Sequence, residues 1–351
     1  MGASPRRDGG VTLLTRPRLT TFAVATTGAA LFWSLNLPLA LLLGPMAACL
    51  VAALMGAKMQ DAGTLGTFMR TFLGVAVGSS ITPATLGHLP DFAWSLLFVP
   101  LFIVVIGAIG YPLFRYAFGF NHPTAWYAAM PGGLQDMLVF GEEAGGDVRA
   151  LSLIHATRVL VIVTSAPLVM TLYWGIDLTQ APGKAAIETD PVQIALMIAA
   201  GFAGWKIAAR VGLFGASILG PMILTAALSL AGILTTRPPA EIIWAAQFFI
   251  GIAVGVKYSG ITWRELRIDV GAGVVYALIL AAISLAFFEV IYLTGLAPAL
   301  DVFLAFLPGG QAEMVVIAII AGADLAYVVS HHLLRIILVI LLAPVVDRLF
   351  R

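Results

Sequence analysis

Met130-Pro131-Gly132-Gly133-Leu134-Gln135-Asp136-Met137 is repeated in altered form, 177 residues further along the chain, as Leu307-Pro308-Gly309-Gly310-Gln311-Ala312-Glu313-Met314. The same offset pairs three further sets of polar residues: Asp147 with Asp324, His155 with His332, and Arg158 with Arg335. Any two membrane segments share hydrophobicity, but scarce polar residues repeated at a constant spacing indicate a duplicated module. The sequence therefore predicts two homologous halves.

Composition places both halves in a lipid bilayer. The 351 residues are 60% hydrophobic and 11% charged, and the mean hydropathy is +1.00. A soluble core of this size could not hide so much apolar surface. The net charge is +1 and the basic residues form no patch, so no nucleic-acid partner is expected. Cys49 is the single cysteine, which excludes an intramolecular disulfide and a cysteine-based metal site.

Polar breaks divide the chain into four parts. We expect a cytoplasmic N-terminal tail at residues 1–18, a membrane repeat at 19–174, a linker at 175–191 and a second membrane repeat at 192–351. Arginines before the first apolar run are typical of a cytoplasmic flank, and no small-residue cleavage site follows that run. The expectation is an uncleaved multipass protein of the bacterial inner membrane, with its N-terminus in the cytoplasm.

Each half contains six apolar segments, and the basic residues indicate how many of them cross. If all segments cross, the cytoplasmic side holds eleven lysines and arginines against six outside, which is a weak bias. If the Pro-Gly-Gly segment of each half is instead broken or re-entrant, the count becomes fifteen against two, with Arg158 and Arg335 lying inside apolar segments. The predicted fold class is therefore an all-α integral membrane protein. Its two modules would form an inverted repeat of 5+5 spans, plus one broken or re-entrant segment in each half.

The two Pro-Gly-Gly breaks are candidate binding elements. In Pro131-Gly132-Gly133 and Pro308-Gly309-Gly310 the proline lacks an amide hydrogen and the glycines leave the backbone unshielded. Such backbone is tolerated at membrane depth only where it is buried in protein or lines a watery cavity. A kink or a close helix crossing is the alternative for a single copy. Two copies favour a site, because the broken segments of inverted repeats meet near the membrane midplane and bind substrate or ions there.

A carboxylate follows each break and an arginine lies in the next apolar segment. An arginine inside such a segment costs about 2.5 to 3.5 kcal/mol on insertion scales unless it is paired or hydrated. Asp136 and Glu313 are therefore expected to be the counter-charges of Arg158 and Arg335. These four residues are predicted either to form buried ion pairs that fix helix packing, or to bind an anion that the arginine fork can grip.

The remaining repeated polar residues carry two interpretations each. His155 and His332 stand three residues before the arginines and share a helix face with them, which suits a proton relay because histidine titrates near neutral pH. Asp147 and Asp324 precede long apolar helices, so they are expected to be helix N-caps or, alternatively, carboxylates for an ion or a proton.

These elements together resemble the bacterial AbrB family of membrane proteins, whose members carry a duplicated membrane domain. The resemblance rests on Leu-Gly-Pro-Met (43–46 and 219–222), Gly-x-Ala-Val-Gly (74–78 and 251–255), the Pro-Gly-Gly motif and His-x-x-Arg, and it covers the chain after the N-terminal tail. Members are labelled ammonia monooxygenase or membrane regulator of gene expression. A monooxygenase would need a cluster of imidazole and carboxylate ligands, and the five histidines form no convincing set.

The sequence thus favours a secondary transporter or permease for a small polar or anionic solute, with coupling to protons left open. Its site residues would be Pro131, Gly132, Gly133, Asp136, Asp147, His155, Arg158, Pro308, Gly309, Gly310, Glu313, Asp324, His332 and Arg335. A membrane sensor with an indirect effect on gene expression and a membrane oxidoreductase stay as alternatives. No cofactor, no metal and no catalytic residue are expected, and a homo-oligomer is left open.

Overall fold

The structure is a computed structural model that describes residues 15–83, 87, 89–213 and 215–349, and every regular element in these ranges is a helix. Residues 1–14 of the expected N-terminal tail, together with residues 350 and 351 of the second repeat, lie outside the described residues. In the first half the helices are α1 (Arg16–Ser34), α2 (Ala40–Leu54), α3 (Gly63–Gly78), α5 (Leu89–Leu96), α6 (Phe98–Pro112), η1 (Leu113–Ala117), α7 (His122–Ala129), α8 (Leu134–Glu143) and α9 (Val148–Trp174). In the second half they are α10 (Pro191–Arg210), α11 (Ala216–Leu230), α12 (Ala240–Gly255), η3 (Val256–Tyr258), α13 (Trp263–Glu265), η4 (Leu266–Val270), α14 (Gly271–Leu293), α15 (Ala299–Phe306), α16 (Gln311–Ala321) and α17 (Leu325–Leu349).

Equivalent helices of the two halves begin at equivalent positions. Helices α3, α7, α8 and α9 start 177 residues before α12, α15, α16 and α17. The segment between the halves contains only the short η2 (Ala186–Glu188) and ends where the Asp190 side chain accepts a hydrogen bond from Val192 N at the start of α10. Local signals such as this cap set the helix boundaries in both copies.

Six helical stretches of the described chain are long and apolar enough to cross a membrane, namely Pro90–Ala117, Val148–Trp174, Pro191–Arg210, Ala240–Tyr258, Trp263–Leu293 and Leu325–Leu349. Helices α2 and α11 have 15 residues each, so they are about 22 Å long, less than the roughly 30 Å hydrocarbon core of a bilayer. The protein is therefore a multipass membrane protein, and a count of ten crossings goes beyond what helix length alone supports.

An apolar run begins at Val270, and from the sequence we expect the membrane span to begin there, with Arg264 and Arg267 in the preceding loop. In the structure a capping box between Thr262 and Glu265 starts the helical stretch earlier, at Trp263. Arg264 and Arg267 therefore lie in the first turns of this stretch, where α13 passes through the π-helical η4 into α14. The shift arises because a capping box can begin a helix on polar residues, ahead of the apolar run.

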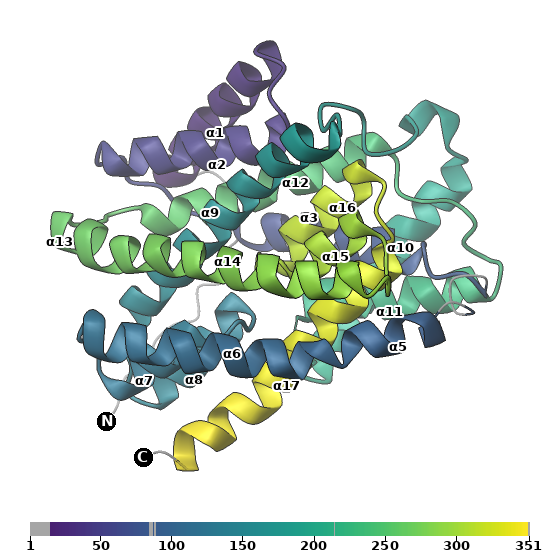
Figure 1. The fold of residues 1–351 in the computed structure, drawn as a ribbon. Helices are drawn as coiled ribbons and strands as arrows, with labels where there is room; N and C mark the ends of the chain where they lie inside the picture. Colours follow the sequence, from purple (N-terminus) through teal and green to yellow (C-terminus); the bar gives the residue numbers. More distant parts are fainter. Residues whose placement is uncertain (1–14, 84–86, 88, 214, 350–351) are drawn as a thin grey trace, which may run out of the picture.

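Helices of the two halves pack against each other in a reciprocal arrangement. Helix α3 of the first half crosses α11 of the second so closely that a Cβ at Gly74 would overlap the backbone oxygen of Ile218. In the same way, a Cβ at Gly251 of α12 would overlap the backbone oxygen of Leu42 in α2. Helix α14 contacts α9, and α17 contacts α6. Helix α14 is the long helix that crosses the view in Figure 1. Each half therefore packs some of its helices against helices of the other half.

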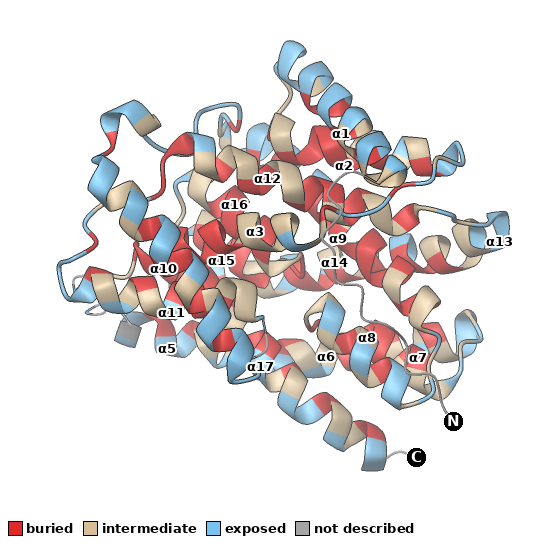
Figure 2. Cartoon of the chain, turned by 180° about the vertical axis from the view of Figure 1, so that it is seen from behind, coloured by how far each residue is buried: buried red, intermediate tan, exposed pale blue. Residues whose placement is uncertain are grey.

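Buried residues concentrate in the helices that carry the repeated motifs. Figure 2 shows them at the centre, in α3, α9, α12 and α14 to α16, while α1, α5 and α10 expose one face. The largest buried cluster joins α3, α9, α12, α16 and α17. Exposed large hydrophobic side chains such as Leu31, Leu101 and Leu278 lie on the outward faces of α1, α6 and α14, which suits contact with lipid.

We predict that Gly74→Ala lowers the free energy of unfolding by about 1 to 3 kcal/mol, because the added methyl group must push two helix backbones apart. The measurement is the thermal unfolding midpoint in detergent. Gly271→Ala is the matched control: its Cβ would meet nothing within 4 Å, so it should be neutral or stabilise α14 by up to about 1 kcal/mol. Equal midpoints for both variants would argue against the close crossing.

Candidate functional site

Both Pro-Gly-Gly motifs interrupt a helix. Helix α7 ends at Ala129 and α8 begins at Leu134, while α15 ends at Phe306 and α16 begins at Gln311. Residues 130–133 and 307–310 between them have no helical assignment. The prediction of a broken segment in each half is confirmed. Helices α8 and α16 have 10 and 11 residues, about 15 Å, or half the thickness of a hydrocarbon core.

Hydrogen bonds join the two ends of each broken segment. Asp147 N, which follows α8, donates to Thr124 Oγ1 in the first turn of α7 at 2.8 Å. Asp324 N, which follows α16, donates to Asp301 Oδ1 in the first turn of α15 at 2.9 Å. The start of the first helix and the end of the second are therefore neighbours in both copies. Each broken segment is a hairpin whose tip is the Pro-Gly-Gly motif.

The arginines hold the tips of the hairpins through main-chain carbonyl groups. Arg158 donates from Nη1 to Met130 O and from Nη2 to Gly132 O, both at 3.4 Å. Arg335 repeats this with Leu307 O at 3.3 Å and Gly309 O at 3.4 Å. Because the break leaves these carbonyls without helical partners, the arginines satisfy part of the backbone that the sequence analysis expected to be exposed.

The histidines and two hydroxyl groups complete the support of the hairpins. His155 Nε2 donates to Tyr127 O at 3.1 Å and His332 Nε2 to Leu304 O at 3.0 Å. Helix α14 reaches both hairpins and caps the last carbonyl before each break: Tyr276 OH donates to Ala129 O and Ser284 Oγ to Phe306 O at 2.9 Å. Both histidines are buried, and their hydrogen bonds tie α9 and α17 to the hairpins.

The glycine pair has a steric reason in each copy. A Cβ at Gly133 would overlap Asp136 Oδ2, and a Cβ at Gly310 would overlap Glu313 Oε2, because each carboxylate folds back over the second glycine. The first glycine faces a methionine: a Cβ at Gly132 would lie 2.7 Å from Cε of Met137, and the second copy repeats this distance. The spacing of glycines, acid and methionine in the motif thus follows from packing at the hairpin tip.

The two tips meet at one cavity of about 220 Å³. Its walls come from both breaks, the first turns of α8 and α16, and parts of α3, α9, α11, α12 and α17. Residues related by the repeat line it as pairs: Gly132 and Gly309, Gly133 and Gly310, Leu134 and Gln311, Gln135 and Ala312, Asp136 and Glu313, Arg158 and Arg335, Val159 and Ile336. We call this the central cavity. Both copies contribute equivalent residues to it.

The expected ion pairs do not form in this cavity. Among the described residues no carboxylate oxygen lies within 4 Å of a guanidinium nitrogen of Arg158 or Arg335. Their bonds go instead to main-chain carbonyls and, for Arg335, also to His332 Nδ1. The two side chains are only 2% and 3% exposed, and neither Nε has a hydrogen-bond partner in the described chain. They are close enough to repel one another electrostatically. Buried guanidinium groups without a paired anion are costly.

Two further cations of the cavity were missed by the sequence analysis. The charge count placed Arg70 on the cytoplasmic side, but this residue lies in α3 and lines the cavity. Lys257 lies in η3, beyond α12. Four cationic side chains and two acids line the cavity, which gives a formal charge of 4 − 2 = +2. The signal for Arg70 was its place inside the apolar segment that begins at Gly63. Lys257 has no repeat counterpart and gave no such signal.

The helices behind the cavity also favour negative charge. Gly133 and Gly310 are the N-cap residues of α8 and α16 and offer no side-chain cap. Asp136 and Glu313 lie in the first turns of these helices, with their carboxylates folded back over the second glycine of each break. The free N–H groups of both helix N-termini and the positive ends of both helix dipoles face the same cavity.

The remaining predicted site residues do not line the cavity. Asp147 is the N-cap of α9, with its side chain accepting from Ala150 N at 3.0 Å, and Asp324 accepts from Ala326 N at 2.8 Å at the start of α17. The N-cap interpretation therefore describes the contacts of both residues. Pro131 and Pro308 are buried in the breaks. Within the described residues no three His, Cys, Asp or Glu side chains group as they would around a metal ion.

Comparisons with known proteins agree with the resemblance seen in the sequence. The chain is 30% identical over 295 residues to "Uncharacterized protein YhjN" of Bacillus subtilis (strain 168), which covers 79% of this chain and 76% of the relative. It is 26% identical over 330 residues to "Putative regulator AbrB" of Escherichia coli (strain K12), covering 90% of this chain and 91% of the relative. The family model described as "Transition state regulatory protein AbrB" matches residues 41–351. The chain, with its duplicated and hairpin-containing membrane helices, therefore belongs to the AbrB family.

Proposed function

We propose that this multipass membrane protein is a secondary transporter or permease for a small anionic solute, and that the central cavity is its binding site. The observation that carries the proposal is the pair of buried guanidinium groups, Arg158 and Arg335, that line one cavity without an ion-paired carboxylate. A bound anion would supply the missing counter-charge.

The geometry suits a solute with a carboxylate or phosphate group. Each arginine has five N–H donors. The bonds of Arg158 and Arg335 to main-chain carbonyls are 3.3 to 3.4 Å long, longer than a typical N–H···O bond, and Arg335 Nη2 also donates to His332 Nδ1 at 3.1 Å. Donors therefore remain for a planar or tetrahedral oxyanion, which the guanidinium fork binds well. A cavity of 220 Å³ has the volume of about seven waters at roughly 30 Å³ each, so the solute would be small.

Asp136 and Glu313 would tune the affinity of the site. Glu313 is within electrostatic range of Arg70 and Arg158, and it is only 8% exposed. Without such negative charges a cavity lined by four cations would hold an anion too tightly for release. Glu313 is also the carboxylate of the site best placed to take up a proton when the solute binds, which would couple transport to protons.

The hairpins support an inverted repeat. A segment whose ends are neighbours enters and leaves on the same side, so each half would have an odd number of crossings and the second half would be inverted. With Arg70 left out because it lies within α3, fourteen lysines and arginines would then lie on the cytoplasmic side against Lys184 and Arg237 outside. We propose this topology in the inner membrane, with the N-terminus in the cytoplasm.

Transport by the purified protein in proteoliposomes tests the function. Uptake of radiolabelled phosphate, acetate, succinate and the neutral solute glycerol is measured with and without an imposed pH gradient. We expect saturable uptake of at least one anion, no uptake of glycerol above empty liposomes, and a change of rate with the pH gradient. If none of the anions is taken up and none raises the thermal unfolding midpoint, the proposal is wrong for this class of solute.

The names of the AbrB relative and of the family model favour a second candidate function, a membrane sensor that affects gene expression. The same central cavity would then bind an anionic effector. The two functions differ in one measurement, because a sensor binds the anion with a shift of the unfolding midpoint but shows no flux above empty liposomes.

A further inference from the structure

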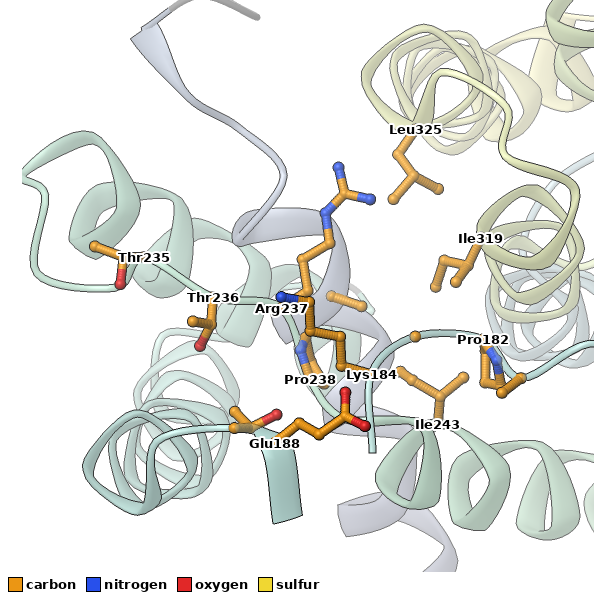
Figure 3. A pocket seen from close by; sticks show the side chains of 14 residues that line it. Pro182, Lys184, Glu188, Thr235, Thr236, Arg237, Pro238, Ile243, Ile319 and Leu325 are labelled. Atoms are coloured by element: carbon orange, nitrogen blue, oxygen red, sulfur yellow. The ribbon is translucent and has the colours of Figure 1, made fainter. Parts of the chain in front are cut away.

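A second cavity, of about 470 Å³, lies between the linker and the loop that joins α11 to α12. Figure 3 shows Pro182, Lys184 and Glu188 of the linker around it, with Ile319 and Leu325 on another side and Arg237 extending toward Leu325. We call it the linker cavity. Its lining includes Lys184, Arg237 and Glu188, so its formal charge is 2 − 1 = +1. No ion pair joins these three side chains in the described structure.

The linker cavity and the central cavity are lined by different turns of the same helices. Helix α3 contributes Arg70 to the central cavity and Ala76 to the linker cavity, while α16 contributes Glu313 and Ile319. Both pairs are six residues apart, about 9 Å along a helix axis. Helix α17 repeats the relation with Arg335 and Leu325, which are about 15 Å apart by the same rise.

Helix α12 runs opposite to α3 and α16, as α17 does, and fits the same layout. Its early residue Ile243 lines the linker cavity and its later residue Ile250 the central cavity. Four helices thus agree that roughly 9 to 15 Å of protein separate the two spaces. The residues midway along three of them, Leu73, Ala246 and Val316, are fully buried in one apolar cluster. These apolar side chains therefore lie between the two cavities.

The basic residues that line the two cavities agree with the proposed topology of the chain. Lys184 and Arg237 are the two basic residues that the charge count assigns to the outside, and both line the linker cavity. Lys257, which the same count assigns to the cytoplasmic side, lines the central cavity. Both basic residues of the linker cavity are exposed, as expected of groups that attract an ion from water and do not bind it tightly.

We propose that the linker cavity is the outer vestibule through which the same anionic solute approaches the central cavity, with Lys184 and Arg237 concentrating it there. The proposal rests on the proposed function and adds a second site to it. The apolar cluster of Leu73, Ala246 and Val316 is then the barrier that must open when the protein exchanges access from one face to the other.

Cysteine accessibility tests the vestibule without measuring transport. In a Cys49→Ala background, Thr235→Cys reports on the linker cavity and Ser217→Cys on the central cavity. A membrane-impermeant maleimide is applied to right-side-out and to inverted membrane vesicles. We expect T235C to react only in right-side-out vesicles and S217C only in inverted ones. Reaction of both from the same side overturns the proposal.

The charge of the vestibule is tested on T235C with anionic and cationic methanethiosulfonates of similar size. We expect the anionic reagent to react about tenfold faster than the cationic one, and this ratio to fall near one when Lys184→Gln and Arg237→Gln are added. Arg264→Gln, which removes an exposed cation from the opposite face, is the matched control and should leave the ratio unchanged. An unchanged ratio in the double variant overturns the vestibule even if transport is found, whereas loss of flux alone would count against the central site.

Discussion

Replacing both Arg158 and Arg335 by alanine is expected to reduce uptake of the transported anion at least a hundredfold. A hydrogen bond to a charged group contributes about 1.5 to 3 kcal/mol, so the loss of two such contacts corresponds to about 100-fold or more in affinity. Each single variant should lose about tenfold. The measurement is the initial rate of uptake in proteoliposomes, together with the anion-dependent rise of the unfolding midpoint.

The same arginines hold the hairpin tips, so stability must be separated from binding. Alanine leaves two carbonyls without donors in each copy, at a cost of about 1 to 3 kcal/mol for each unsatisfied group. Arg158→Lys and Arg335→Lys keep the charge and one donor but lose the fork. We expect these variants to stay folded and still lose about tenfold in uptake. Lysine variants with full uptake and unchanged KM would restrict the arginines to a structural role.

The matched control for these variants is Arg115→Ala. Arg115 also donates to a main-chain carbonyl, from Nη1 to Phe120 O at 2.9 Å, but it lies in η1 and does not line the central cavity. The control should therefore change stability modestly and leave the KM for the anion unchanged. If Arg115→Ala lowers uptake as strongly as the cavity variants, the effect is one of general folding.

Glu313→Gln is expected to tighten anion binding and slow transport. The substitution raises the formal charge of the central cavity from +2 to +3. At an effective dielectric constant of about 20, a unit charge about 8 Å from the anion contributes about 2 kcal/mol, or roughly 30-fold in affinity. The unfolding midpoint should respond to lower anion concentrations, while the maximal uptake rate falls about tenfold and no longer depends on a pH gradient.

Asp136→Asn tests whether the equivalent carboxylate of the first half affects anion binding as much as Glu313 does. Asp136 occupies the equivalent position but is more exposed than Glu313, so water screens its charge and its removal should change affinity less than threefold. Equal effects of the two substitutions would indicate that burial does not distinguish them. Weaker anion binding in Glu313→Gln would contradict the role of Glu313 as a competing negative charge.

The sequence was informative wherever it repeated a scarce residue. The membrane class, the duplication, the break at each Pro-Gly-Gly motif and the capping contacts of Asp147 and Asp324 follow from composition, offset and turn chemistry, and the described helices agree with them. The prediction that Asp136 and Glu313 are the ion-pair partners of Arg158 and Arg335 was wrong. A sequence lists side chains and does not show where unsatisfied main-chain carbonyls point. Arg158 and Arg335 turn to those carbonyls, and in the described structure Asp136 and Glu313 lie in the first turns of α8 and α16 without an ion pair to either arginine.

Features without a repeated partner were the ones the sequence could not predict. Tyr276 and Ser284 of α14 support both hairpins, yet neither stands at a position that the repeat marks. Lys257 joins the central cavity only because α12 packs across the boundary between the halves. Contacts of this kind depend on tertiary packing, which periodicity along one chain does not encode.

The reciprocal crossing of α3 over α11 and of α12 over α2 constrains how the protein is made. When the ribosome has completed α3 at Gly78, the backbone of Ile218 that Gly74 must meet is still unsynthesised. At about 5 to 20 residues per second, the 152 residues up to the end of α11 at Leu230 take roughly 8 to 30 s. During that interval the glycine-containing face of α3 lacks its packing partner from the second half. A truncated product ending in the linker would keep that face open and be a natural substrate for membrane proteases.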